Sequence, residues 1–153
     1  MSLDQVDWAV QRLCDSAPTP SDEDFARWLA AVNAVVPLAG ELTLRLVDAE
    51  ESQTLNQQWR DKPRPTNVLS FGYGDMPELL GDLVFCVPLV AEEAQAQQKP
   101  CLDHWAHLTI HGLLHLSGYD HELSSEAEIM EAQEIAILAT LDISNPYETS
   151  HAA

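Results

Sequence analysis

Basic residues are scarce in this sequence: 7 of the 153 residues are Lys or Arg, against 25 Asp and Glu. The formal net charge of −18 gives the molecule an average surface field that repels polyanions such as RNA and anionic membranes. Any contact with nucleic acid must therefore be local. Arg60, Lys62 and Arg64 form a basic cluster that could make such a contact, although charge alone favours a solvated loop.

Cysteine is also rare, and Cys14, Cys86 and Cys101 form neither an even disulfide set nor a CxxC pair. This usage fits a reducing compartment in which the thiols are core residues. No apolar run approaches the length of a membrane-spanning helix, and the start of the chain lacks the pattern of a secretory signal. We therefore expect a cytoplasmic protein with no membrane partner.

The rest of the composition is that of an ordinary globular protein. Hydrophobic residues make up 46% of the chain and charged residues 21%, and the length suits one domain with one core. No break in composition or internal repeat divides the chain. We predict a single domain over residues 1–153, with a poorly ordered tail from about residue 148.

Hydrophobic periodicity predicts interleaved helices and strands. Alternation predicts strands at 6–13 and 41–48, and a further strand is expected at 67–73 after the Pro-rich break. A continuous apolar run predicts a buried strand at 83–87 after a turn-rich loop at 74–82. Helical spacing, caps and prolines predict helices at 22–36, 49–59, 88–98, 102–118 and 124–141, of which 102–118 is central and buried. The order predicts an α+β fold, with about five helices flanking a small mixed sheet of about four strands.

Three histidines lie within the eleven residues HGLLHLSGYDH, at the end of the central helix. His111 and His115 are four residues apart, which places their imidazoles about 40° apart around the helix and one turn apart along it. Gly118 stands where a helix can end, so the chain can bring His121 back to the same point. Three imidazoles with an open fourth position are typical of a catalytic zinc site. We predict one Zn²⁺ per chain at His111, His115 and His121.

Other histidines extend this stripe toward the start of the helix. A lone buried histidine is more often a hydrogen-bonded core residue than a ligand. His107 is therefore open to two interpretations: it supports a ligand or contacts a phosphate, or it only packs. His104 lies one turn further from the motif, and His151 is expected to be exposed in the tail.

The histidine spacing also matches the zinc-protease pattern HExxHxxGxxH, but Gly112 stands where that pattern requires its glutamate base. A protease would need a carboxylate from elsewhere in the chain. A three-histidine metal can instead supply activated water for attack on a phosphodiester. The phosphate then needs a donor for its developing charge, and Arg60 is the candidate because a guanidinium makes planar bidentate contacts.

Four segments together carry a resemblance to a known family. HGLLHLSGYDH, with RDKPRPTNVLSF at 60–71, LGDLVFC at 80–86 and MEAQEIAILATL at 130–141, resembles the YbeY family of bacterial rRNA maturation endoribonucleases. The likeness implies a metal-dependent, single-strand-specific endoribonuclease that acts in 16S rRNA 3′-end maturation and ribosome quality control. It also implies zinc at His111, His115 and His121, a functionally important Arg60 and an α+β fold.

The roles of three neighbouring residues stay open. Asp82 and Asp120 are candidates for proton transfer, although a turn at a strand start and support of a ligand histidine are the favoured roles. Lys62 is a candidate substrate contact. Because the chain is so acidic, a ribosomal protein or an assembly GTPase is a candidate partner that delivers the RNA. The alternative function is a ribosome-assembly binding factor whose metal is structural and has a fourth protein ligand.

Overall fold

The computed structural model describes residues 6–72, 79–117 and 124–147 of the chain. These residues form four strands and five helices, which confirms the predicted α+β class. The elements are β1 (Val6–Arg12), α1 (Asp22–Asn33), β2 (Gly40–Val47), α2 (Ala49–Arg60), β3 (Val68–Phe71), β4 (Leu79–Cys86), α3 (Val87–Ala96), α4 (Cys101–Leu116) and α5 (Ser124–Thr140). The predicted tail from about residue 148 lies outside the described residues.

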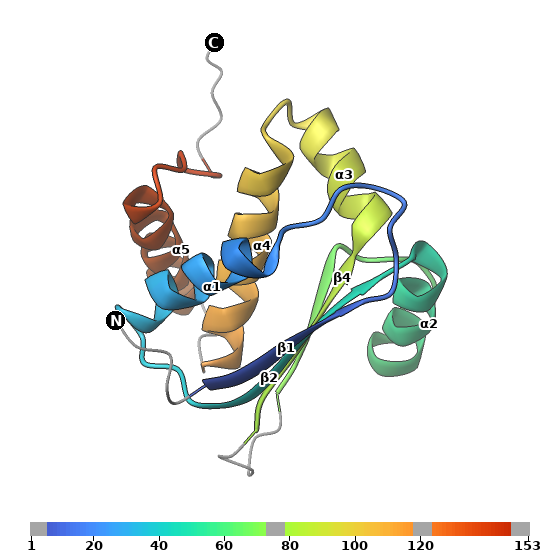
Figure 1. Ribbon diagram of the computed structural model, residues 1–153, viewed down its shortest axis with the longest axis horizontal. Coiled ribbons are helices and arrows are strands. Elements are labelled where there is room, and N and C mark those ends of the chain that lie inside the picture. Colours follow the sequence, from blue (N-terminus) through green and yellow to red (C-terminus); the bar gives the residue numbers. More distant parts are fainter. Residues whose placement is uncertain (1–5, 73–78, 118–123, 148–153) are drawn as a thin grey trace.

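The four strands form one mixed sheet in the order β1-β2-β4-β3. β1 pairs parallel with β2, β2 pairs parallel with β4, and β3 pairs antiparallel with β4. Figure 1 shows α1, α4 and α5 over one face of this sheet and α2 on the other. The mixed sheet is therefore covered on both faces, as predicted.

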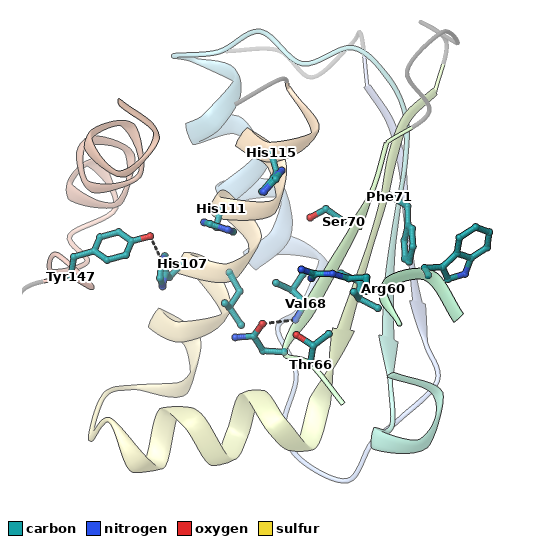
Figure 2. A pocket seen from close by; sticks show the side chains of 13 residues that line it. Arg60, Thr66, Val68, Ser70, Phe71, His107, His111, His115 and Tyr147 are labelled. Atoms are coloured by element: carbon teal, nitrogen blue, oxygen red, sulfur yellow. Dashed lines mark hydrogen bonds between the residues drawn. The ribbon is translucent and has the colours of Figure 1, made fainter. Parts of the chain in front are cut away.

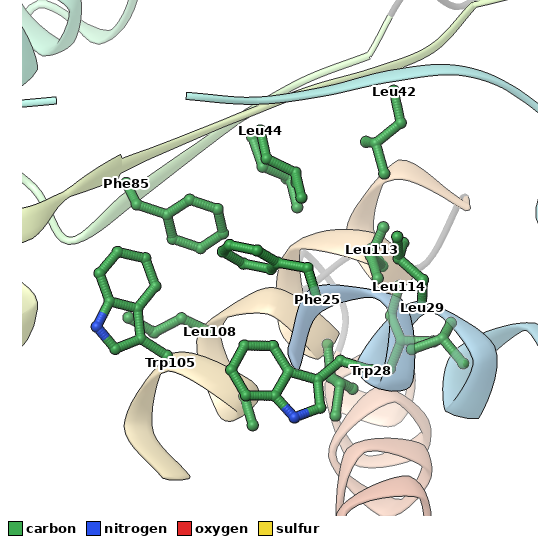
Figure 3. Packing of buried hydrophobic residues seen from close by; sticks show 14 of the residues in the cluster. Phe25, Trp28, Leu29, Leu42, Leu44, Phe85, Trp105, Leu108, Leu113 and Leu114 are labelled. Atoms are coloured by element: carbon green, nitrogen blue, oxygen red, sulfur yellow. The ribbon is translucent and has the colours of Figure 1, made fainter. Parts of the chain in front are cut away.

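The larger core lies between the sheet and α1, α4 and α5. Leu42, Leu44 and Leu46 of β2 are each at most 1% exposed, which is the burial that their alternation predicts for one face of a strand. Aromatic rings fill the space beneath them (Figure 3): Phe25 and Trp28 of α1, Phe85 of β4 and Trp105 of α4. The Phe85 and Trp105 ring centroids are 5.1 Å apart, so the sheet and α4 are in direct contact.

A smaller apolar cluster covers the opposite face of the sheet. Val47, Leu69 and Val84 form its buried centre, and Leu55 of α2 and Phe71 of β3 pack against it. β4 contributes to both clusters, because its successive side chains point to opposite faces. This explains why the apolar run at 83–87 is continuous rather than alternating.

Two helix starts follow from local side-chain chemistry. Ser21 caps α1 by accepting a hydrogen bond from the Asp24 backbone, and the Asp24 carboxylate accepts one from the Ser21 backbone. The Asp48 carboxylate caps α2 by accepting from the backbone of Glu51. Both caps were predicted. α1 ends at Asn33, earlier than the predicted residue 36, and the Asn33 side chain accepts a hydrogen bond from the backbone of Leu38.

The prediction of a loop through residues 74–82 was wrong for its last four residues, since β4 begins at Leu79. Leu79, Gly81 and Asp82 pair with β2, and the register shifts between Glu41 and Leu42. Gly81 lies at this irregularity with a φ of +147°, which favours glycine. Its turn-like composition thus marks a bulge within the strand. Pairing with distant strands, which local sequence does not report, decides where β4 begins.

The central helix is α4, as predicted. Nine of its 16 residues are buried, and it contacts α1, α3, α5, β3 and β4. The helix therefore holds its histidines on a rigid element fixed from several sides. Within the described residues, no helix is long and apolar enough to cross a membrane.

Candidate active site

Four histidines form a row along α4. The ring centroids of neighbours are 6.3 Å apart for His104 and His107, 6.2 Å for His107 and His111, and 5.6 Å for His111 and His115. Exposure rises along the row, from 4% of the His104 side chain through 15% for His107 and 24% for His111 to an exposed His115. The row thus runs from the interior of the protein to its surface.

The outer three histidines of this row line a cavity of about 800 Å³. Figure 2 shows two facing walls: His107, His111 and His115 on α4, and Arg60, Thr66, Val68, Ser70 and Phe71 on the other side. The second wall combines the end of α2 with β3 and the segment that leads into it. Tyr147 also lines the cavity. Residues from distant parts of the sequence therefore meet around the predicted metal ligands.

A buried carboxylate is hydrogen-bonded to two of the histidines. Glu134 of α5 is 0% exposed, and its Oε1 lies 3.1 Å from both His107 Nε2 and His111 Nδ1. The Tyr147 hydroxyl donates to the same carboxylate, with distances of 2.9 Å to Oε1 and 3.0 Å to Oε2. A buried carboxylate needs such donors to remain ionised. Glu134 therefore links α4, α5 and the residue that follows them at the cavity rim.

The ionisation of this network follows from burial and hydrogen bonding. Burial by itself would raise the pKa of Glu134, but hydrogen bonds from His107 and His111 outweigh it and lower the pKa to about 2. Burial lowers the pKa of His107, only partly offset by Glu134. Burial and the Glu134 charge both raise the pKa of Tyr147, so its hydroxyl stays protonated. At neutral pH the carboxylate is the acceptor for every group around it.

This hydrogen bonding decides which nitrogen of His111 carries its proton. An ionised carboxylate can only accept, so the His111 Nδ1 that faces Glu134 is the protonated nitrogen. Nε2 is then the nitrogen with the lone pair. The tautomer of His111 is therefore the one in which Nε2 can act as a metal ligand.

His107 faces Glu134 with the other ring nitrogen, Nε2 instead of Nδ1. Its Nε2 faces Glu134 and Tyr147, and its Nδ1 is buried without a hydrogen-bond partner among the described residues. The His107 ring is thus hydrogen-bonded to the same carboxylate oxygen as His111, and its role in supporting a ligand stays a prediction.

The residues could hold a metal ion in two ways. Ligand atoms of His107, His111 and Glu134 all lie within 4.8 Å of one another. The second set is the predicted one, in which His111 and His115 are neighbours on the cavity wall. Its third member, His121, lies outside the described residues, as does Asp120. Imidazole nitrogens suit zinc and related transition metals in either arrangement.

The basic cluster is divided by the structure. Arg60 is the last residue of α2 and lines the cavity, and Figure 2 shows its side chain reaching toward the histidine wall. Asp61 follows in the left-handed conformation, with a φ of 58°, and turns the chain away. Lys62 and Arg64 are exposed and are not among the lining residues. The structure therefore brings Arg60, but not Lys62, to the predicted site.

The three arginines that precede the basic cluster in the sequence, Arg12, Arg27 and Arg45, are each paired with a carboxylate. Arg12 lies 2.7 Å from Asp22, Arg27 lies 3.1 Å from Asp24, and Arg45 bonds to Glu51. Within the described ranges, no carboxylate forms an ion pair with Arg60. Its charge is available to an anion that enters the cavity.

Asp82 lies elsewhere. It belongs to β4 and lines a second cavity on the α2 side of the sheet, together with Arg45, Glu51 and Trp59. The cavity with the histidines does not include it among its lining residues. The structure thus does not bring Asp82 to His111 or His115, the two predicted ligands that it describes.

Gly112, directly after His111, explains the departure from the protease pattern. A Cβ at this position would meet Leu83 Cδ2 at 2.7 Å, and Leu83 is fully buried in β4. α4 therefore approaches the sheet too closely for a glutamate beside His111. The position that carries the base in zinc proteases points into the sheet here.

Sequence reasoning missed Glu134 and Tyr147. The signal for Glu134 was present, because Met130, Glu134, Ile137 and Leu138 are all 0% exposed and follow helical spacing. A glutamate within that apolar stripe requires a buried partner. Its partner lies 23 residues earlier in the chain, so spacing alone could not identify it.

Comparison with known proteins identifies the family of this chain. The family model described as Endoribonuclease YbeY matches residues 16–142. The chain is 49% identical over 147 residues to Endoribonuclease YbeY of Colwellia psychrerythraea, covering 90% of this chain and 94% of that protein. It is 44% identical over 153 residues to Endoribonuclease YbeY of Halorhodospira halophila, covering 95% and 99%.

A solved structure shares the fold as well. The solution structure of a Thermotoga maritima protein matches with a TM-score of 0.58 and 25% sequence identity, over 95% of this chain and 99% of that one. The matched residues include Arg60, Glu134 and the predicted ligands His111 and His115. The resemblance inferred from four short segments is thereby confirmed, and the chain belongs to the Endoribonuclease YbeY family.

Proposed function

We propose that this protein is a metal-dependent endoribonuclease that cleaves single-stranded RNA, with Zn²⁺ bound by His111, His115 and His121. Family membership supports hydrolysis of RNA within rRNA processing. Our proposal adds 16S rRNA or its precursor as the substrate, maturation of its 3′ end as the step, and the cytoplasm as the place.

The observation that carries the metal assignment is the hydrogen bond between His111 Nδ1 and Glu134, at 3.1 Å. It orients the ring and leaves Nε2 as the ligand nitrogen, which is how carboxylates support metal-binding histidines in general. His115 stands one turn further on the same wall. We therefore propose that Glu134 orients a ligand rather than binding the metal itself.

The alternative set of His107, His111 and Glu134 is less suited to an ion. Glu134 is fully buried and already accepts hydrogen bonds from two imidazoles and Tyr147. A metal there would have to displace these protons in the protein interior, whereas His111 and His115 open to the cavity. Accessibility thus favours the three-histidine set, which also leaves a position for water.

When bound at such a site, the ion supplies water activated for nucleophilic attack at neutral pH. The protein's own residues then have two tasks. Glu134 keeps His111 in one tautomer and orientation. Arg60, on the facing wall, binds the phosphate by two parallel hydrogen bonds and stabilises the charge that develops on it.

The acidity of the chain shapes how RNA reaches this cavity. With a net charge of −18, the protein gains little from nonspecific attraction to phosphates. We propose that a ribosomal protein or an assembly GTPase presents the RNA, so that Arg60 needs to bind only the phosphate at the reaction centre. Such delivery would replace the basic surface that most RNA enzymes use.

The test compares cavity variants with a variant of the same basic loop. His115→Ala and Arg60→Glu should each reduce cleavage of a single-stranded RNA by at least about 100-fold. Arg64→Glu is the matched control, because Arg64 carries the same charge four residues away but does not line the cavity. Cleavage at the wild-type rate by folded His115→Ala and Arg60→Glu proteins would contradict the mechanism.

A further inference from the structure

Trp59 is the most exposed of the large hydrophobic side chains in the described part of the chain, at 62%. Trp28 and Trp105, by contrast, are each 1% exposed and belong to the core. Tryptophan is highly buried on average, since its large apolar ring is costly to leave in water. An indole in this state calls for a reason other than packing.

The packing of α2 does not supply that reason. The apolar cluster under α2 is formed by Val47, Leu69 and Val84 with Leu55 and Phe71, and Trp59 is not part of it. The indole makes an edge contact with Phe71 at a centroid distance of 6.1 Å and an interplanar angle of 71°. This contact leaves most of the surface of Trp59 exposed.

Trp59 lines two neighbouring cavities. One is the histidine cavity, which it lines together with Arg60, whose charge has no carboxylate partner among the described residues. The other is the smaller cavity, where Arg45 is already paired with Glu51 and the Asp82 carboxylate adds a negative charge. A phosphate chain is therefore attracted to the histidine side, where a base can meet the indole and a phosphate can meet the adjacent guanidinium.

We propose that Trp59 is a stacking platform for one unpaired nucleobase, next to the phosphate that Arg60 binds. The inference rests on the proposed function, and it names a subsite of the same cavity. Indole stacks on any base, but only where the base is unpaired and unstacked from its neighbours. The subsite therefore selects single-stranded RNA without reading a particular sequence. It also supplies affinity that does not depend on positive charge, which is scarce in this protein.

The first experiment measures binding of a single-stranded RNA oligonucleotide to metal-loaded protein. Trp59→Ala should weaken binding about 5- to 150-fold, as expected for the loss of one stacked base. Trp59→Phe should retain most of the affinity, because it keeps an aromatic face. The loss in Trp59→Ala should be similar at low and high salt, whereas Arg60→Ala should lower the dependence on salt.

The second experiment locates the base by removing it from the RNA. Oligonucleotides with one abasic nucleotide are bound to wild type and Trp59→Ala, one position at a time. At one position, base removal should weaken the wild type as much as Trp59→Ala does, and should weaken Trp59→Ala no further. Leu13→Ala, which alters another exposed apolar side chain at 54% exposure, is the control and should bind normally.

The outcomes separate this inference from the proposed function. If the wild type cleaves RNA but folded Trp59→Ala binds every oligonucleotide equally well, the stacking subsite is wrong and the nuclease stands. The subsite is also wrong if no abasic position is coupled to Trp59, and the indole would then be a contact for a protein. If the wild type does not cleave single-stranded RNA at all, both proposals are overturned.

Discussion

Two glutamates, one on α3 and one on α5, pair with histidines in the row along α4. Glu93 of α3 lies 2.8 Å from His104 Nε2, and Glu134 of α5 lies 3.1 Å from His107 and His111. Their burial is reversed. At the first pair the imidazole is buried at 4% exposure and the carboxylate is 29% exposed, while at the second the carboxylate is at 0% and the imidazoles reach 15% and 24%.

The difference in burial corresponds to a difference in position: the Glu93–His104 pair joins helices, whereas the histidines paired with Glu134 line a cavity. Glu93 also accepts from the Asn67 side chain, so it ties α3 and α4 to the segment before β3. Glu134 is hydrogen-bonded to His107 and His111, and both rings line the larger cavity. A buried carboxylate behind a partly exposed imidazole is thus the arrangement that prepares a ligand, and the opposite arrangement mainly fastens the fold.

The largest difference between the two pairs should appear when the histidines are removed. His111→Ala should lose its metal and reduce RNA cleavage by at least about 100-fold, since a ligand is missing. His104→Ala should keep metal and cleavage and lose only stability, by about 1–3 kcal/mol, because Glu93 loses a partner. Elemental analysis, cleavage rates and thermal unfolding measure the three effects. Equal metal content in the two variants would contradict the distinction.

Acid should distinguish the pairs in metal-free, chelator-washed protein. The pKa of Glu134 falls from 4.5 to about 2 in the folded state, so the unfolded state binds the proton first as the pH drops. The stability that Glu134 contributes is complete above about pH 4.5 and is lost toward pH 2, a total of about 3 kcal/mol. Burial by itself would raise the pKa of Glu93 too, but hydrogen bonds from His104 and Asn67 lower it overall. Glu93 therefore also contributes stability that is lost as the pH falls.

The measurement is the free energy of unfolding from denaturant titrations across this pH window. Glu134→Gln should flatten the acid side of the curve much more than Glu93→Gln does. If the acid side of the curve is the same in wild type and Glu134→Gln, folding does not lower the pKa of Glu134.

Metal affinity gives the next largest contrast. Glu134→Gln should weaken metal binding by about 10- to 100-fold, because His111 loses the acceptor that fixes its tautomer. Glu93→Gln is the matched control and should leave affinity unchanged, since its histidine lies outside the cavity. Competition with a chromophoric chelator measures both values without relying on activity. If Glu134→Gln and His107→Ala, as separate variants, each lose all metal while His115→Ala retains it, the ligands are His107, His111 and Glu134 instead.

The smallest expected effect belongs to Tyr147. Tyr147→Phe removes one hydrogen bond to Glu134 and leaves both histidines in place, so it should cost about 1 kcal/mol of stability. Metal affinity should fall only a few-fold. Chemical denaturation and chelator competition, run beside Glu134→Gln, test this order. A loss larger than that of Glu134→Gln would place Tyr147, rather than the carboxylate, at the centre of the network.

Local signals predicted most of the fold, and distant contacts account for what was missed. The capping box of Ser21 and Asp24 and the alternation in β2 depend on neighbours in sequence, and both predictions were confirmed. The start of β4 depends on pairing with β2 across a bulge, and it was predicted too late. At the site, the spacing of His111 and His115 is also local, and the structure places both on one wall. Glu134 supports His111 only because α5 packs on α4.

The close approach of α4 to the sheet at Gly112 restricts how this scaffold could evolve. Installing a glutamate there would introduce the catalytic base of a peptidase beside an existing histidine, by one amino-acid substitution. The buried Leu83 blocks that route, because the helix would first have to lift away from β4 and disturb the core beneath it. Specialisation for RNA is thus protected by tight packing beneath the site, in addition to the side chains that face the substrate.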